Sequence, residues 1–338
     1  GHNWNSSYVS LVTETDYENL SEGGSQNGVV SYIIDTYAES PMLRLDSNDL
    51  PHIVYYTYSG TSDEVIRSLR YATYQEMEIG AGYNWQKSTI IGGIAECGSD
   101  IFVCNDIAGF ELDSNNNPHI VYHSGNFSGD SSNWSYENIL NYAISDDWST
   151  WNTSKIYTTY HDSVSLSNYI LEASMTLDSQ DQVNMIALTT GPGFISDDFF
   201  NPEIIYLKFD GENIIQSISI SSVGWNGDMD YNYWKRTTLS ITVDSEDLIH
   251  LGYINSLNQF IYSTLEFDGL EPFITTSIIV SAPLQDNDSP LHDFYDLRLV
   301  IEPDGTPHAL YTSMLGDYSL LPDGETLDSL DEKGFSIY

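Results

Sequence analysis

The chain has 338 residues, with 50 Asp or Glu against 10 Lys or Arg and a formal net charge of −40 at pH 7. This charge repels nucleic-acid phosphates and anionic lipids, whose binding needs clustered basic side chains. The composition is 41% hydrophobic and 13% aromatic, which suffices for a packed core and argues against intrinsic disorder. No apolar run of about 18 residues occurs, so the sequence predicts no membrane-inserted helix.

One eleven-residue pattern recurs five times along the chain. It consists of an apolar residue, an acidic residue, a polar turn, and then a strand with His at its second position. Successive copies are 58 to 67 residues apart, and Asn184 takes the His position in the third copy. The copies occupy 45–55, 112–122, 177–187, 243–253 and 301–311.

Each copy predicts a β-hairpin, because alternating apolar residues flank a turn rich in Asp, Ser and Asn. A third and a fourth strand follow in each unit, such as 69–72 and 85–91 in the first. Four-stranded antiparallel units, repeated without a long amphipathic helix, predict an all-β fold, a five-bladed β-propeller forming one domain over 1–338. The repeat units are about 42–91, 109–156, 174–220, 240–280 and 298–338.

The two ends of the chain predict how the ring closes. The last unit ends after its third strand, at 334–338, and has no fourth. The segment 3–12 resembles the fourth strand at 84–91, since both begin with Asn-Trp. We therefore expect the N-terminal strand to complete the C-terminal blade, which removes the open sheet edges.

The repeat is similar to a known one. The copy that runs from Leu112-Asp113-Ser114 to Pro118-His119-Ile120-Val121-Tyr122 resembles the Leu-Asp-Ser-x-Gly-x-Pro-His-Ile-x-Tyr propeller repeats of secreted and surface proteins of bacteria and archaea. The resemblance covers essentially the whole chain and implies a secreted or cell-surface propeller. The sialidase Asp box, Ser-x-Asp-x-Gly-x-Thr-Trp, is absent from the sequence.

The two cysteines, Cys97 and Cys104, lie close together in the sequence. A local disulfide between them would indicate an oxidising, extracellular compartment, and two free thiols are the alternative.

The repeated acidic residue and His allow a structural and a metal-binding interpretation. Asp side chains commonly accept hydrogen bonds from the backbone of a turn, and a His can pack between blades. Recurrence in every unit favours the structural interpretation, because a catalytic site is rarely five-fold. The acidic residues are Asp46, Asp113, Asp178, Asp244 and Glu302.

Long connections are predicted on one side of the repeat units, between one blade and the next and in the second turns at 124–139 and 190–203. Long loops on a rigid scaffold commonly carry function. Their oxygen-bearing side chains could bind Ca²⁺, and a solvated acidic loop is the alternative. The candidate metal ligands are Asp106, Asp162, Asp293, His161 and His292.

The connection 225–236 combines aromatic, acidic and basic residues. Sugar rings stack on aromatic side chains and form hydrogen bonds with Asp and Asn, so this loop is a candidate glycan site. Aromatic side chains packed between blades are the alternative. The candidate ligand-binding residues are Trp225, Asp228, Asp230, Tyr231, Tyr233, Trp234 and Arg298.

Charged residues also occur on the predicted innermost strands, where burial is costly unless the charges are paired or wet. The acidic ones are Glu111, Glu172 and Asp296. They are candidates for the two carboxylates of a glycoside hydrolase. The alternative is a structural network in which Arg44 and Arg298 neutralise them.

These features predict an extracellular or cell-surface binding module for a glycan or another extracellular partner, with calcium as a possible cofactor. A glycoside hydrolase is one alternative. A self-assembling component of a cell envelope or extracellular filament, or a part of a larger parent protein, is the other. The sequence contains no Gly-rich phosphate loop, zinc pattern or Gly-x-Ser-x-Gly nucleophile elbow.

Overall fold

The computed structural model describes the strands and most of the short turns of the chain. In the described ranges all regular structure is β, as the repeat predicted, and none of it is a helix that could cross a membrane. The described residues are 33–34, 38–61, 64–76, 83–95, 107–130, 133–162, 170–190, 202–222, 239–255, 259–268, 271–281, 292–302, 305–315 and 335–337.

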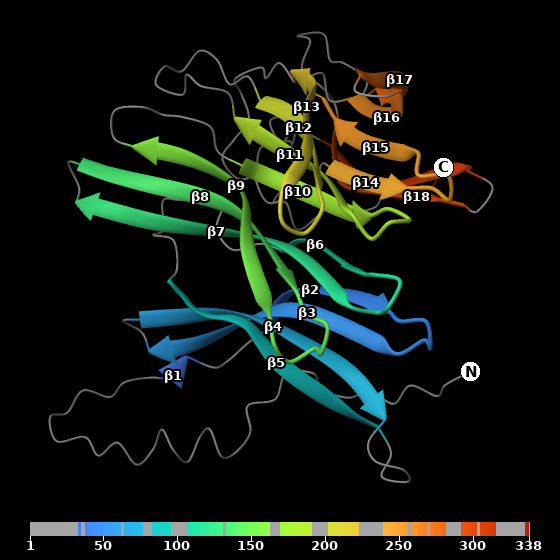
Figure 1. Cartoon of the computed structure of the whole chain (residues 1–338). Coiled ribbons are helices and arrows are strands. Elements are labelled where there is room, and N and C mark those ends of the chain that lie inside the picture. The colour runs from blue at the N-terminus through green and yellow to red at the C-terminus, as the bar shows by residue number, and fades with distance from the viewer. Residues whose placement is uncertain are drawn as a thin grey trace, which may run out of the picture. The chain divides into compact units, whose positions relative to one another are not determined.

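The strands form five antiparallel sheets, one for each repeat (Figure 1). The first sheet has the order β1-β3-β4-β5, and β2 also pairs with β3. The second has the order β6-β7-β8-β9. These strands are β1 (Ile33–Ile34), β2 (Ala38–Leu45), β3 (Pro51–Thr61), β4 (Glu64–Glu76), β5 (Tyr83–Ala95), β6 (Ile107–Leu112), β7 (Pro118–Asp130), β8 (Asn133–Ile144) and β9 (Asn152–Asp162).

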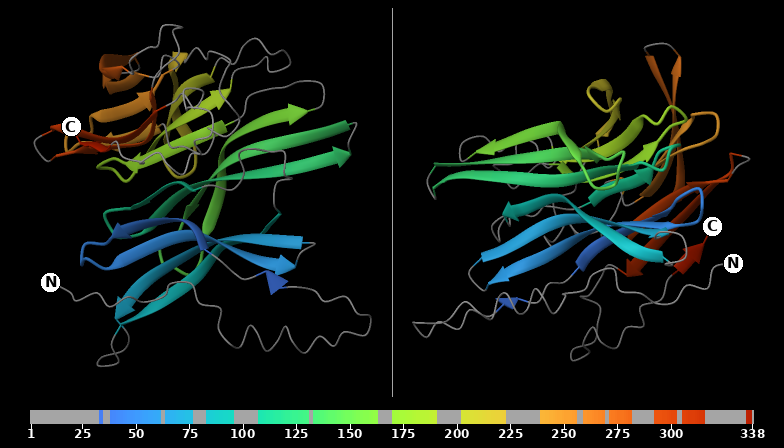
Figure 2. Two further views of the ribbon diagram at one scale, coloured as in Figure 1. Left: turned by 180° about the vertical axis from the view of Figure 1, so that it is seen from behind. Right: turned by 60° about the horizontal axis from the view of Figure 1, so that its bottom comes forward.

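The third, fourth and fifth sheets have the orders β10-β11-β12-β13, β14-β15-β16-β17 and β18-β19-β20. Figure 2 shows the twist of the hairpins from two further sides. These strands are β10 (Ile170–Leu177), β11 (Val183–Thr190), β12 (Pro202–Phe209), β13 (Ile214–Ser222), β14 (Leu239–Val243), β15 (Ile249–Ile254), β16 (Gln259–Asp268), β17 (Glu271–Ser281), β18 (His292–Ile301), β19 (Pro307–Leu315) and β20 (Phe335–Ile337).

The chain forms two compact units, Gly1–Ile120 with Ala143–Thr153, and Val121–Tyr142 with Ser154–Tyr338. In the first unit, Tyr71 is buried and makes edge-to-face ring contacts with Phe110 and Trp151. In the second unit, one core cluster joins Ile186 and Tyr206 of the third sheet to Ile241 of the fourth. Consecutive sheets of each unit therefore share apolar side chains.

The repeated Asp fixes the turn of the first hairpin in the first four repeats. Asp113 Oδ1 accepts the backbone N–H groups of Asn115 and Asn117 at 2.8 and 2.7 Å. Asp46, Asp178 and Asp244 accept the corresponding two groups in their own turns. The structural interpretation of these carboxylates is therefore confirmed.

The residue three positions after the acidic one lies in the left-handed region, with φ of 65° at Asn116 and 85° at Gly305. Asp49, Asp181 and Asp247 take the same conformation at 59° to 63°. Asn, Asp and Gly tolerate it better than other residues do. This explains why the polar turns contain these three residue types.

The residue with positive φ also forms hydrogen bonds with the turn of the preceding repeat. Asn116 exchanges two hydrogen bonds with Ser47, through Ser47 N at 3.1 Å and Ser47 Oγ at 3.0 Å. In the second unit, Asp247 accepts from Ser179 N at 2.8 Å and from Ser179 Oγ at 2.6 Å. Ser47 and Ser179, which directly follow the repeated Asp, therefore link neighbouring turns.

The repeated His lies between the turn carboxylate and a Tyr of the third strand. His250 has Nε2 3.2 Å from Asp244 Oδ2 and Nδ1 2.6 Å from the Tyr262 hydroxyl. His52 makes the same pair with Asp46 and Tyr71, and its ring lies against Trp148. The expectation that the His packs between neighbouring repeats holds for His52.

The fourth strands of three sheets contain β-bulges. The extra residues include Ile90 in β5, Ile215 and Ile220 in β13, and Ile279 in β17. Because bulges interrupt the outward row of backbone groups, they oppose edge-to-edge pairing with another chain.

Two expectations about the connections were wrong. The first sheet starts before residue 42, because β1 pairs with the end of β3 and β2 begins at Ala38. The turn expected over 124–139 is a long hairpin, since β7 continues to Asp130 and β8 starts at Asn133. Gly, Ser and Asn in this segment are typical of a turn, but here they occupy paired strands.

Candidate functional site

The predicted site residues divide into those that the structure describes and those that it does not. Trp225, Asp228, Asp230, Tyr231, Tyr233 and Trp234 lie outside the described residues, as do Asp106, Cys97, Cys104 and the segment 3–12. The aromatic loop, the disulfide and the N-terminal closing strand therefore stay predictions.

Glu111 is held by Arg44 in the first unit. The Arg44 guanidinium donates from Nε to Glu111 Oε2 at 2.8 Å and from a terminal nitrogen to Oε1 at 2.6 Å. The hydrogen bond to Glu111 raises the pKa of Arg44, although burial opposes the shift. The expected neutralisation of an innermost-strand carboxylate by Arg44 is confirmed, and Glu111 has a structural partner.

Glu172 has a structural partner as well. Its Oε1 accepts the backbone N–H of Leu239 at 2.9 Å, which joins β10 to the start of β14. A neighbouring link joins β14 to β18, where Ser240 Oγ accepts the backbone N–H of Leu299 at 2.9 Å. Side chains of the first strands therefore connect consecutive sheets in the second unit.

Asp296 and Arg298 both lie in β18, and the side chain of Asp296 is outside the description. Arg298 is exposed and donates to the carbonyl of its neighbour Leu297 at 3.1 Å. The contacts of the described side chains do not test whether Arg298 neutralises Asp296, so this pairing stays a prediction.

The metal candidates occur at strand ends. His161 and Asp162 end β9, and His292 and Asp293 begin β18. All four were expected in the connections, and this was wrong, because β9 and β18 extend over them and the connections are shortened to 163–169 and 282–291. Within the described side chains, no group of three His, Cys, Asp or Glu is placed to bind a metal ion.

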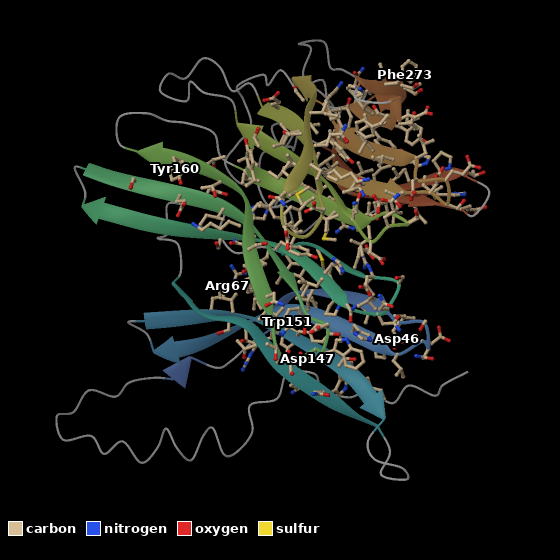
Figure 3. All side chains as sticks on the ribbon, in the orientation of Figure 1. Asp46, Arg67, Asp147, Trp151, Tyr160 and Phe273 are labelled. Carbon is tan, nitrogen blue, oxygen red and sulfur yellow. The ribbon has the colours of Figure 1, made fainter. Side chains whose placement is uncertain are left out.

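An aromatic feature that the sequence analysis missed lies at the same end of β9. Tyr160 is 66% exposed, although it belongs to a strand (Figure 3). Three residues earlier, Tyr157 is half-buried, and burial together with the charge of Glu203 raises its pKa. Glu203 lies near the start of β12, directly after the connection 191–201.

These residues lie beside two of the long connections. Strand alternation places Tyr157 and Tyr160 on opposite faces of β9. The exposed ring of Tyr160 can therefore stack on a ligand, whereas Tyr157 and the nearby Glu203 lie on the other face of β9 and do not share that surface. The signal in the sequence is weak, because the chain has 25 Tyr residues and most of the repeated ones are buried.

A second exposed aromatic provides a contrast. Phe273 is 65% exposed and lies near the start of β17, just after the short turn that follows β16 (Figure 3). Tyr160 instead lies at the end of its strand, next to a long connection. The two side chains therefore match in exposure and differ in the kind of connection they adjoin.

No protein-family model and no curated protein matches the chain. Solved structures that resemble it include polysaccharide lyase Uly1, at 10% identity and a TM-score of 0.44, with 82% of this chain and 55% of that one covered. The chain thus spans about half the length of that lyase.

Two further similar structures are a mutant Aleuria aurantia lectin with alpha-methyl-L-fucoside and the Penicillium chrysogenum alpha-L-arabinanase with arabinobiose. The lectin has 12% identity and a TM-score of 0.39, covering 84% of this chain and 71% of the lectin. The arabinanase has 10% identity and a TM-score of 0.34, covering 82% of this chain and 88% of the arabinanase. At these scores the similarities define neither fold details nor function.

Proposed function

We propose that the chain is a five-bladed β-propeller that binds a glycan on the side of its long connections. The observation that carries the glycan proposal is Tyr160, an exposed aromatic ring next to the connection 163–169. Aromatic rings stack on the C–H faces of sugars, and this stacking needs a solvent-facing ring on a rigid element. The aromatic loop at 225–236 would supply further stacking and hydrogen-bonding groups.

The proposal that the five sheets are blades of a closed ring is supported by the repeats. Five sheets follow one another along the chain, and first strands join neighbouring sheets through Arg44 with Glu111 and through Glu172 with Leu239 N. The fifth sheet has three strands among the described residues. The segment 3–12 would pair with β20 as its fourth strand.

The same contacts favour binding over hydrolysis. An acid–base pair needs carboxylates that can face substrate and exchange protons. Glu111 is held by a guanidinium and Glu172 by a backbone N–H group. We therefore propose a binding module outside the cell or on its surface. Ca²⁺ would assist through Asp106, Asp162 and Asp293 with His161 and His292.

A glycan array tests the proposal, using the full chain with Ca²⁺ and again with a chelator. We expect signal on a restricted set of glycans, and a loss of about fivefold in Tyr160→Ala, because one stacked aromatic contributes roughly 1 kcal/mol. Phe273→Ala is the matched control and should bind as the wild type does. An array without signal in both conditions would refute glycan binding, and signal that is equal in both would remove the calcium part.

A further inference from the structure

The outer strand of the fourth sheet has an open and uncharged edge. Among the described strands, β17 pairs only with β16, so its other backbone edge has no partner in this set (Figure 1). Phe273, Ile278 and Ile279 are 65%, 59% and 48% exposed, and the Thr and Ser residues at 275–277 are exposed as well. Residues 272–281 include no charged side chain, although 18% of the chain is charged.

The outer strands β5, β9 and β13 carry features that oppose pairing at an edge. β5 and β9 each contain an exposed lysine, Lys87 and Lys155. β13 has no charge, but its bulges leave only residues 216–219 in regular register. Lysines and bulges are common means by which natural sheets prevent edge-to-edge association. β17 has no lysine, and its bulge at Ile279 lies near one end, so it is the least protected of these four strands.

The part of β17 that is available for pairing is short. Pro272 has no backbone N–H to donate, and the bulge at Ile279 interrupts the other end, so residues 273–278 remain. This stretch consists of aromatic, β-branched and hydroxyl-bearing residues, which favour extended structure. A strand added here would gain main-chain hydrogen bonds along the open edge. The stretch 273–278 therefore has the chemistry of a strand-addition site.

The same stretch is complementary to itself. When two copies of β17 pair antiparallel about a two-fold axis at Thr276, Ile274 lies opposite Ile278 and Thr275 lies opposite Ser277. Apolar residues then face apolar residues and hydroxyl groups face hydroxyl groups, which are favourable cross-strand pairs. A two-fold axis at either neighbouring residue would instead place an Ile opposite Thr276. The sequence of the edge therefore selects one register for self-pairing.

Charge favours a second copy of the chain at this edge over a basic partner. A basic protein would be attracted to the many acidic residues of the chain, and an edge without charge offers it no ion pair. A second copy instead brings an equally uncharged edge. The two copies still repel each other through net charges of −40, so their association should strengthen as salt screens the repulsion.

We infer that the outer edge of β17 is a self-association site, at which two copies of the chain pair antiparallel through residues 273–278 and join their fourth sheets. An interface this short is smaller than the roughly 800 Å² per partner of a standard stable complex, so the dimer is weak and depends on concentration. The inference does not depend on glycan binding. An array without signal leaves it intact, and a monomer that binds glycan leaves the proposed function intact.

Analytical ultracentrifugation of the unmodified full chain tests self-association without a variant. We expect a monomer–dimer equilibrium whose dissociation constant falls about tenfold between about 0.1 M and 1 M NaCl, because the Debye length shrinks from about 10 to 3 Å. A chain that stays monomeric at about 1 mM in both salts would overturn the inference, since this excludes a micromolar dissociation constant. Association that weakens as salt rises would overturn it as well.

Paired charge variants test the register. Thr275→Lys with Ser277→Lys places like charges opposite each other across the dimer, as Thr275→Glu with Ser277→Glu does, so each variant alone should be monomeric. An equimolar mixture of the two should dimerise, because each Lys then lies opposite a Glu. The matched control, Ser217→Lys with Ser219→Lys in β13, should associate as the wild type does. All four positions are exposed, so folding should be retained. A mixture that stays monomeric, or a control as impaired as the β17 variants, would overturn the inference.

Discussion

Arg44 and Glu111 form a two-point ion pair between the first strands of the first and second sheets, at 2.8 and 2.6 Å. Both side chains remain partly exposed, so the net contribution is small although the geometry is favourable. A double-mutant cycle with Arg44→Met and Glu111→Gln should give a coupling energy of about 1 kcal/mol in chemical denaturation. The coupling should decrease in 1 M salt. A coupling of zero at low salt would remove this pair as a link between the sheets.

The repeated turn predicts a specific sensitivity at Asp113. Asp113→Ala should lower the unfolding free energy by about 1–3 kcal/mol, because two backbone N–H groups lose their acceptor. Asp113→Asn retains an oxygen at the same place and should cost clearly less. Chemical denaturation of both variants checks this, and equal losses would show that hydrogen bonding to the turn is not the main contribution.

The same carboxylates predict how stability depends on pH. Burial opposes ionisation of Asp113, but N–H donors from Asn117 and Asn115 outweigh it and hold the pKa below the ordinary value. The pKa of Asp178 and of Asp244 is lowered in a similar way. A lowered folded-state pKa means that the stabilisation is present above about pH 4, the unfolded value, and is lost as pH falls through the folded values. Thermal melts should therefore show a steep loss below pH 4, and Asp113→Asn should flatten it.

The third repeat replaces His by Asn184 and adds a cation. Lys208 Nζ lies 2.7 Å from Asp178 Oδ2, where the carboxylate is almost fully buried, and Asn184 Nδ2 donates to the same oxygen at 3.2 Å. Lys208→Met should lower the free energy of unfolding by about 1–3 kcal/mol, because the buried carboxylate of Asp178 loses its ion-pair partner. Lys155→Met is the control, since Lys155 is exposed and pairs with Glu137 at 3.1 Å, and it should cost below about 0.5 kcal/mol. Similar losses in urea denaturation would contradict the account.

Gly252 predicts the effect of added volume between the fourth and fifth sheets. A Cβ there would lie 3.2 Å from Leu297 Cδ2 and 3.3 Å from Phe260 Cε2. Gly252→Ala should therefore destabilise by about 1 kcal/mol, and Gly252→Val by about 1–3 kcal/mol. Combining Gly252→Ala with Leu297→Ala should cost less than the sum of the two changes. Strict additivity would show that Leu297 does not cover this position.

The hairpins and their turns could be predicted from the sequence because five copies repeat the same Asp, polar turn and His positions. The third strand was predicted for the same reason, as β4, β8, β12 and β16 show. The two-residue strand β1 has no repeated counterpart, and the Gly- and Ser-containing hairpin at the end of β7 has the composition of a turn. Residue composition and the alternation of apolar and polar residues therefore do not predict that these two segments pair as strands.

Side-chain pairing across repeats was harder to predict. Charges on the first strands indicated that Arg44 neutralises a carboxylate, but not that Glu111 is its partner. The hydrogen bonds of Ser47 with Asn116 join residues 69 positions apart, so no local pattern indicates them. Tyr160 was missed because its sequence neighbours, Thr158 and Thr159, are as compatible with a buried strand as with an exposed one.

The central claim is that the long-connection side binds a glycan through exposed aromatic rings. Titration calorimetry with the strongest ligand of the array, on the wild type, Tyr160→Ala and Phe273→Ala, tests it most directly. We expect saturable binding by the wild type and by Phe273→Ala, with the dissociation constant raised about fivefold in Tyr160→Ala. Equal affinity in all three proteins would contradict the claim for Tyr160. Loss of affinity in Phe273→Ala alone would place the site near the short turn that precedes β17.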